Sequence, residues 1–298
     1  MTDVALHVTD DRTSIERLSD LFDRQHGDSG LPSSFFELDP QPHDEPNVAG
    51  SWRFTMYCEA HDLARWENTL EQLVVQCGLT ASVDVEDLGE RDWISETLRD
   101  LAPVRAGRFI VHGSHDRGRA NGSIRIEIDA GLAFGTGHHG TTMGCLELLE
   151  DVARRRKPRN AFDVGTGSGV LAIAAARCLK VPALASDVDP TATRVAHANA
   201  VLNGCGPLVS TFAATGLSHP AYEAAGNAEL VFANILAGPL RKLARPIAER
   251  TAPGGEVILS GLLPRQGAHI VSTYRAHGLV LRRRLVRDGW LSLLLRKP

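Results

Sequence analysis

Three glycines at alternate positions follow a short apolar run, in the segment Asp163-Val-Gly-Thr-Gly-Ser-Gly169. Glycine is needed where the backbone turns sharply and a ligand approaches it without meeting a Cβ atom. As the dinucleotide motif G-x-G-x-x-G, the segment fails from Gly165 because Val170 holds the third position, and from Gly167 it passes in a relaxed form with Ala172. An acidic residue before alternate glycines fits a nucleoside cofactor that carries a sulfonium better than it fits a dinucleotide. A dinucleotide fold stays open, and a plain glycine-rich turn is the structural alternative.

Asp187 ends the next apolar run, 22 positions after Gly165. A carboxylate there can accept hydrogen bonds from both hydroxyls of a ribose, in either type of nucleotide fold. Two residues further on, Asp189-Pro190 is typical of a helix start, with aspartate as N-cap and proline at the first helical position. We therefore assign Asp187 to ligand binding and Asp189 to structure.

Asn234 lies in the segment Ala233-Asn-Ile-Leu-Ala-Gly-Pro239, just after an apolar run that starts at Glu229. In open α/β sheets, the carboxyl ends of the strands face the ligand crevice. The side-chain oxygen of Asn234, together with the backbone carbonyl of Ile235, can accept hydrogens from a substrate amine and aim the nitrogen lone pair at an electrophile. The structural alternative is that Asn234 caps the following helix.

A loop rich in glycine and hydroxyl groups, Gly131-Leu-Ala-Phe-Gly-Thr-Gly-His-His-Gly-Thr-Thr142, precedes a helical pattern and suits a backbone lid over a cofactor. His138 and His139, with His112 and His115 upstream, raise a zinc site as an alternative. No cysteine or carboxylate completes a tetrahedral set there, so we expect no metal.

The elements that must position these motifs are strands and helices in alternation. Such alternation predicts an α/β fold with a doubly wound, mostly parallel sheet and helices on both faces. The last two runs are joined by the tight turn Val286-Arg-Asp-Gly289, so the sheet should end in an antiparallel hairpin. The expected strands are 161–164, 183–186, 229–232, 256–260, 279–285 and 290–295, and the expected helices are 141–152, 168–178, 190–203 and 236–249.

The first 90 residues show a different order, β-α-β-β-α-β, which is that of a ferredoxin-like domain. Its expected strands are 4–8, 34–38, 52–59 and 81–85, and its expected helices are 14–25 and 61–77. Residues 92–102 are amphipathic at helical spacing and suit a linker helix. We therefore expect an N-terminal domain over 1–90, a linker over 91–106 and a large domain over 107–298, whose first strands are 108–112 and 123–128.

Composition excludes several classes of protein. Of the 298 residues, 43% are hydrophobic and 23% are charged, which rules out wholesale disorder and fibrous repeats. No apolar run reaches the roughly 18 residues of a membrane span, and the acidic N-terminus lacks the order of a secretory signal. The five cysteines include no C-x-x-C pair, which argues against a disulfide framework. We expect a soluble, cytoplasmic protein.

Charge is divided unevenly along the chain. Residues 1–90 hold 19 acidic and 5 basic side chains, a net of −14, whereas residues 91–298 hold 17 acidic and 27 basic side chains, a net of +10. The acidic block is either a solvated surface or a docking surface whose field attracts a basic macromolecule.

Four segments, in order, resemble the ribosomal protein L11 methyltransferase family: AFGTGHHGTT, DVGTGSGVLAIAA, SDVDPTATRVAHANAVLNG and FANILAGPL. They cover roughly residues 131 to 241, and residues 103–116 resemble the domain junction of that family. The resemblance implies a class I methyltransferase fold with a seven-stranded sheet. It also implies methyl transfer from S-adenosylmethionine to lysine ε-amines or the N-terminal α-amine of ribosomal protein L11, with the N-terminal domain recognising this partner.

The resemblance also implies which residues contact the cofactor. These residues are Thr142, Gly165, Asp187 and Asn234, with Gly167 and Gly169 in the same glycine loop. The family often has Thr-His-Pro where this chain has His138-His139-Gly140, and Thr166 replaces a frequent cysteine.

Three other functions stay open. An NAD-type oxidoreductase would use the same glycines, but it gives no reason for the Asn-Ile-Leu-Ala segment. A nucleic-acid N-methyltransferase usually stacks a flipped base on an aromatic ring, whereas Ile235 and Leu236 follow Asn234 here, and an acidic domain would repel phosphates. The third is an interaction protein with an idle cofactor pocket. For the methyltransferase we expect no required nucleic acid and no membrane.

Overall fold

The computed structural model describes residues 3–26, 33–38, 51–87, 103–117, 124–128 and 139–298. The chain divides into two compact units, Met1–Trp93 and Ile94–Pro298. Each unit is described by itself below.

The N-terminal unit is built around an antiparallel sheet of four strands in the order β2-β3-β1-β4. Its elements are β1 (Asp3–Asp10), α1 (Arg12–His26), β2 (Ser33–Glu37), β3 (Trp52–Glu59), α2 (Leu63–Gln76) and β4 (Asp84–Asp87). This order of elements and strands is that of a ferredoxin-like domain, as predicted. The last strand begins three residues later than expected. Ala81 and Val83 pack against the core without joining the sheet, and β4 is an exposed edge.

Helical spacing of apolar residues explains how the two helices cover this sheet. Trp66, Leu70, Leu73 and Val74 of α2 are buried, on the face that their spacing predicted. Gly78 follows the helix with a φ of +67°, a left-handed conformation that ends a helix most easily at glycine.

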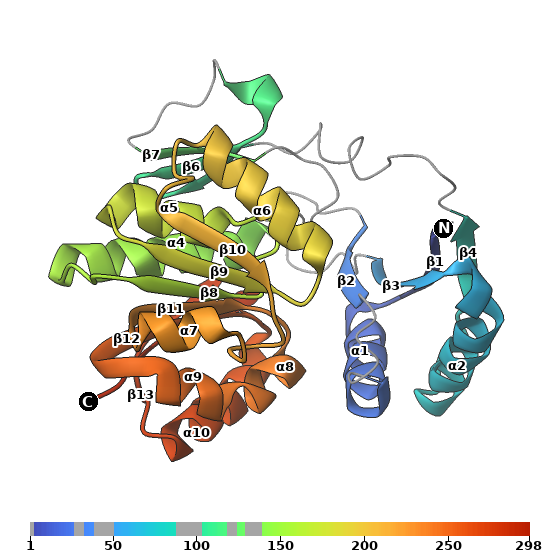
Figure 1. The fold of residues 1–298 in the computed structure, drawn as a ribbon. Coiled ribbons are helices and arrows are strands. Elements are labelled where there is room, and N and C mark those ends of the chain that lie inside the picture. The colour runs from blue at the N-terminus through green and yellow to red at the C-terminus, as the bar shows by residue number, and fades with distance from the viewer. Residues whose placement is uncertain (1–2, 27–32, 39–50, 88–102, 118–123, 129–138) are drawn as a thin grey trace. The chain divides into compact units, whose positions relative to one another are not determined.

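The C-terminal unit holds a seven-stranded sheet in the order β10-β9-β8-β11-β12-β14-β13 (Figure 1). Its strands are β8 (Ala161–Val164), β9 (Ala183–Asp187), β10 (Val209–Ala213), β11 (Ala228–Asn234), β12 (Thr251–Leu262), β13 (Val280–Arg287) and β14 (Trp290–Arg296). The strands β8 to β12 run parallel, and β14 is antiparallel to both of its neighbours. The predicted α/β class and C-terminal hairpin are confirmed.

Helices cover both faces of this sheet. They are α4 (His139–Arg155), α5 (Val170–Leu179), α6 (Pro190–Leu202), α7 (Pro220–Ala225), α8 (Ala237–Lys242), α9 (Ala244–Arg250) and α10 (Gly267–Ala276). Side chains of α4, α5 and α6 form one buried cluster on the sheet, and those of α7 to α10 form a second. The sheet is therefore buried on both faces, which is why its strands read as continuous apolar runs.

Four features of this unit differ from the expectation. The strand β10 was not predicted, because its sequence Val-Ser-Thr-Phe-Ala has polar residues and forms an edge of the sheet. The helices α7 and α10 were also not predicted. The single helix expected over 236–249 is two helices, because Pro246 has no N–H to bond the carbonyl of Lys242 and its ring crowds that carbonyl.

A small three-stranded sheet lies ahead of the large one in the chain. It is formed by β5 (Val104–Ala106), β6 (Phe109–His112) and β7 (Ile124–Glu127). The predicted linker over 91–106 therefore ends in a strand, which pairs antiparallel with β6. The linker helix expected over 92–102 lies outside the described residues.

The direction of winding defines one crevice. From β8 the chain moves outward through β9 to β10, and it then returns to the other side of β8 to form β11. The carboxyl ends of β8 and β11 thus flank the topological switch point, where open α/β sheets bind ligands. In the part of the chain that the structure describes, no helix has the length and apolar character needed to span a membrane.

Candidate active site

The glycine loop between β8 and α5 has a backbone that other residues rarely adopt. Gly165, Gly167 and Gly169 have φ values of +74°, +52° and +84°. A Cβ atom on Gly165 would lie 2.4 Å from Cγ2 of Ile235, and one on Gly169 would lie 3.0 Å from Cβ of Ala196 on α6. Gly165 therefore brings the β8 loop against the segment that follows β11, while Gly169 allows α5 to pack closely on α6.

Asp187, at the end of β9, is held by two backbone donors. The N–H of Gly167 donates to Oδ2 at 2.9 Å, and the N–H of Asp189 donates to Oδ1 at 3.2 Å. The side chain is half-buried, and both oxygens keep a lone pair for a further donor. The carboxylate is thus preset at the crevice beside the glycine loop.

Asp189 has the structural role that its sequence context predicted. Its side chain accepts the N–H of Thr191 at 2.7 Å, and Pro190 is the first residue of α6. The helix ends at the cap residue Asn203, and Gly204 follows with a φ of +66°.

Asn234 is the last residue of β11, on the opposite side of the crevice from β9. Its side-chain Nδ2 donates to Oγ1 of Thr141 at 3.3 Å, which leaves the amide oxygen for another donor. The cap of the following helix α8 is Leu236, without a side-chain hydrogen bond, so Asn234 is not the helix cap considered as an alternative. The structure therefore presents an amide acceptor at the switch point.

The backbone carbonyl of Ile235, the second predicted acceptor, packs against Gly261. A Cβ atom at Gly261, whose φ is +80°, would lie 2.4 Å from this carbonyl oxygen. The carbonyl occupies space that a side chain would otherwise fill. Gly261 therefore covers one side of this carbonyl oxygen.

Thr142 lies in the first turn of α4, next to Thr141. The side chain of Thr142 is 4% exposed, and its hydroxyl oxygen is buried without a hydrogen-bond partner among the described residues. A buried hydroxyl of this kind is a suitable ligand contact, since it gains a hydrogen bond when a polar group arrives. His138 lies outside the described residues, as does the side chain of His139.

Asp163, at the carboxyl end of β8, was noted in the sequence only as the acidic residue before the glycines. Its Oδ2 accepts hydrogen bonds from the hydroxyl of Thr166 at 2.7 Å and from the N–H of Ala172 at 3.1 Å. Its Oδ1 is buried without a partner among the described residues. Burial raises the pKa of this carboxyl to about 6, so a cation placed beside Oδ1 would favour the charged form.

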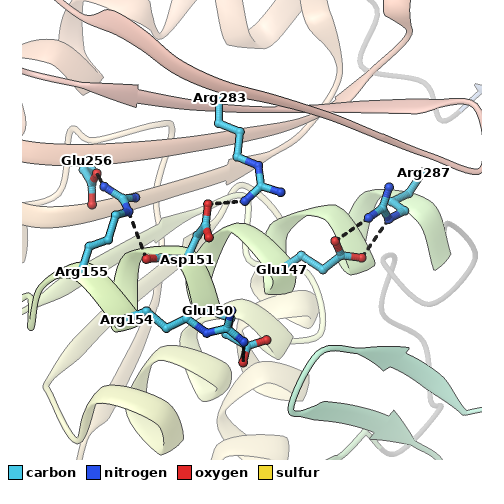
Figure 2. Close-up of polar contacts among 8 residues, drawn as sticks. All are labelled: Glu147, Glu150, Asp151, Arg154, Arg155, Glu256, Arg283 and Arg287. Carbon is cyan, nitrogen blue, oxygen red and sulfur yellow. Dashed lines mark hydrogen bonds and ion pairs between the residues drawn. The ribbon is translucent and has the colours of Figure 1, made fainter.

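Ion pairs fix α4, the helix that carries Thr141 and Thr142, to the C-terminal strands (Figure 2). Arg287 of β13 donates twice to Glu147, at 2.8 and 2.7 Å, and Arg155 pairs with the buried Glu256 of β12 at 2.9 Å. Asp151 pairs with Arg283 of β13, whereas the Glu150–Arg154 pair that the figure also draws lies within α4. The pairs of Glu147, Asp151 and Arg155 thereby anchor the middle and the end of α4 to β12 and β13.

Of the four histidines considered for a zinc site, His112 has a described side chain, and its contacts do not suggest a metal ligand. His112 is buried, and its Nδ1 lies 2.8 Å from the carbonyl oxygen of Gly113. Within the described ranges, no three histidine, cysteine or acidic side chains are grouped as a metal site would require.

Comparison with known proteins identifies the family. The family model described as "Ribosomal protein L11 methyltransferase (PrmA)" matches residues 28–298. The chain belongs to this family. The resemblance predicted from the four motifs is therefore confirmed, and with it the class of enzyme.

Two curated members of the ribosomal protein L11 methyltransferase family match nearly the whole chain. The protein from Mesorhizobium japonicum is 43% identical over 297 residues, covering 99% of this chain and 100% of its own length. The protein from Bradyrhizobium diazoefficiens is 49% identical over 272 residues, covering 90% and 91%. A crystal structure of a ribosomal protein L11 methylase from Lactobacillus delbrueckii subsp. bulgaricus is 26% identical, with a TM-score of 0.59, and covers 66% of this chain and 99% of its own.

Proposed function

We propose that this L11 methyltransferase family member transfers methyl groups from S-adenosylmethionine to amino groups of ribosomal protein L11, in the cytoplasm. The observation that carries the proposal is the pairing of two kinds of acceptor at the β8–β11 switch point. Asp187 and the glycine loop suit a nucleoside, and Asn234 suits an amine. The substrate is inferred from the relatives, which are named ribosomal protein L11 methyltransferase.

The residues present fit this cofactor. Asp187 would accept the ribose hydroxyls, and Thr142 and the glycine loop would contact the remainder. The orphaned Oδ1 of Asp163 fits a cationic group, such as the ammonium of a methionine moiety. When bound, S-adenosylmethionine supplies a methyl group on a positively charged sulfur, which is already a strong electrophile. The protein must mainly hold the amine in line with the methyl carbon.

Asn234 would orient the reactive form of the amine. A lysine ε-amine has a free pKa of ~10.4 and is protonated at pH 7, whereas a chain-terminal amine has a pKa of ~7.7–8.0. Only the neutral amine has a lone pair for the methyl group. The side-chain oxygen of Asn234 accepts an N–H of either amine and orients that lone pair. Among the described residues none is placed as a dedicated general base.

The N-terminal unit is proposed as the docking surface for L11. Within it, residues 1–90 hold 19 acidic and 5 basic side chains, and all four residues of the edge strand β4, Asp84–Asp87, are exposed. An acidic surface attracts a basic protein and repels the phosphates of nucleic acid. Neither nucleic acid nor a membrane is required in this proposal.

The cofactor assignment is tested by replacing Asp187. Asp187→Ala should weaken the binding of S-adenosylmethionine by about 1–3 kcal/mol, because it removes a charged acceptor shared by two hydroxyls. Isothermal titration calorimetry of the folded variant measures this change directly.

Asp189→Ala is the matched control, two residues away. It removes the cap of α6 and should lower the free energy of unfolding by about 1 kcal/mol, with cofactor affinity within about twofold of the parent protein. Unchanged affinity in Asp187→Ala would remove this residue from the cofactor site.

A further inference from the structure

Thr141 joins two neighbouring strands at the crevice. Asn234 of β11 and Ser260 of β12 are partners in the parallel register of these strands. Asn234 donates its Nδ2 to the side-chain oxygen of Thr141 at 3.3 Å, and Ser260 donates its hydroxyl to the backbone carbonyl of Thr141 at 3.4 Å. One residue of α4 is thus bonded to adjacent strand ends through its side chain and its backbone.

The position of Thr141 is tightly fixed by its surroundings. Oγ of Ser260 also lies 2.8 Å from Oγ of Ser292 on β14, and Thr141, Ser260 and Ser292 are all buried. A Cβ atom on Gly144 would lie 2.2 Å from Oγ of Ser292, and one on Gly140 would lie 2.5 Å from the carbonyl oxygen of Arg287. The helix therefore sits directly on β14 and the hairpin, and the ion pairs of Figure 2 hold the rest of its length.

The direction of the Asn234 amide decides whether it helps or hinders an amine. The amide oxygen accepts an N–H, but the amide nitrogen carries only donors and would oppose the lone-pair orientation that methyl transfer needs. With Nδ2 bonded to Thr141, the oxygen is the atom left for the substrate. We propose that Thr141 is a positioning residue that holds the Asn234 side chain with its oxygen toward the substrate amine, and that Ser260 holds Thr141. This inference rests on the proposed function.

Two variants at position 141 separate the hydroxyl from the shape of the side chain. Thr141→Val keeps the shape and removes the hydroxyl, and Thr141→Ser keeps the hydroxyl. We expect Thr141→Val to lower kcat for L11 methylation by about tenfold or more, because a misplaced catalytic group loses much of its effect. The KM for L11 and the calorimetric Kd for S-adenosylmethionine should stay within about twofold, and Thr141→Ser should recover most of kcat.

A double-mutant comparison shows whether Thr141 acts through Asn234. In an Asn234→Ala background, Thr141→Val should cause no further loss of kcat, since the group it positions is already gone. A purely structural role would lower the melting temperature and reduce kcat equally in both backgrounds. If Thr141→Val does not fold, Ser260→Ala is tested in its place. We expect Ser260→Ala to cause a smaller loss of kcat, and this loss should also disappear in the Asn234→Ala background.

The outcomes distinguish this inference from the function on which it rests. If Asn234→Ala is as active as the parent enzyme, the proposed amine acceptor is wrong. If Asn234→Ala is inactive while folded Thr141→Val keeps full kcat, the acceptor stands and the positioning role of Thr141 is overturned. Failure of Thr141→Ser to recover activity, in a protein with the parental melting temperature, would also overturn it.

Discussion

Replacing Asn234 by alanine is expected to lower kcat for methylation of L11 by about 100-fold, with a much smaller change in affinity for S-adenosylmethionine. The physical reason is that the amide oxygen at the end of β11 is the proposed partner of the substrate amine, and it orients the amine lone pair. Steady-state methylation rates, with calorimetry of cofactor binding on the same preparation, measure the two quantities.

The size of the two losses decides between roles for Asn234. The resemblance of its segment to the family implies a cofactor contact at this residue, whereas we propose the substrate amine as its partner. A loss of cofactor affinity that matches the loss of kcat would make Asn234 a cofactor ligand, and methyl transfer at the parental rate would exclude it from the reaction. A parental melting temperature shows that the variant is folded.

Removal of the N-terminal unit is the second change with a large expected effect. A protein comprising Ile94–Pro298 should bind S-adenosylmethionine within about threefold of the full chain, since every proposed cofactor contact lies in that unit. Its rate of L11 methylation should fall by about 100-fold or more, because the acidic surface that would position a basic substrate is gone. The truncated protein must first be shown to be folded by circular dichroism.

An electrostatic docking surface also has a salt signature in the full-length enzyme. The rate of association with L11 should fall as salt rises from ~0.05 to ~0.5 M, because the Debye length shrinks several-fold over that range. If the folded, truncated enzyme methylates L11 as fast as the full chain does, the acidic residues are only a solvated surface.

The order of elements and the glycine loop were predictable from the sequence because they depend on local signals. Apolar runs marked β8, β9 and β11, and the position of Asp187 at the end of a run placed its carboxylate at the correct edge of the sheet. The capping role of Asp189 also depends only on its neighbours in the chain. The edge strand β10 was missed, since its polar residues weaken the apolar signal.

The contacts of the site residues depend on pairing between distant segments, which the sequence does not state. Thr141 and Asn234 are 93 positions apart, and their hydrogen bond follows from the packing of α4 on the edge where β11 and β12 end. The sequence therefore showed Thr142 through resemblance, but it did not show Thr141 as a partner of Asn234. In the same way, the burial of Oδ1 of Asp163 depends on how distant segments pack around it, which the sequence does not state.

The central claim is that this chain transfers methyl groups from S-adenosylmethionine to amino groups of ribosomal protein L11. Intact-mass spectrometry of purified L11, incubated with the full-length enzyme and the cofactor, tests it most directly. The account predicts that the mass of L11 rises in steps of one CH2 unit, that peptide mapping places the added methyl groups on amines, and that the rise is absent without the cofactor. An unchanged mass of L11, with an enzyme that binds S-adenosylmethionine and is fully folded, would contradict the claim.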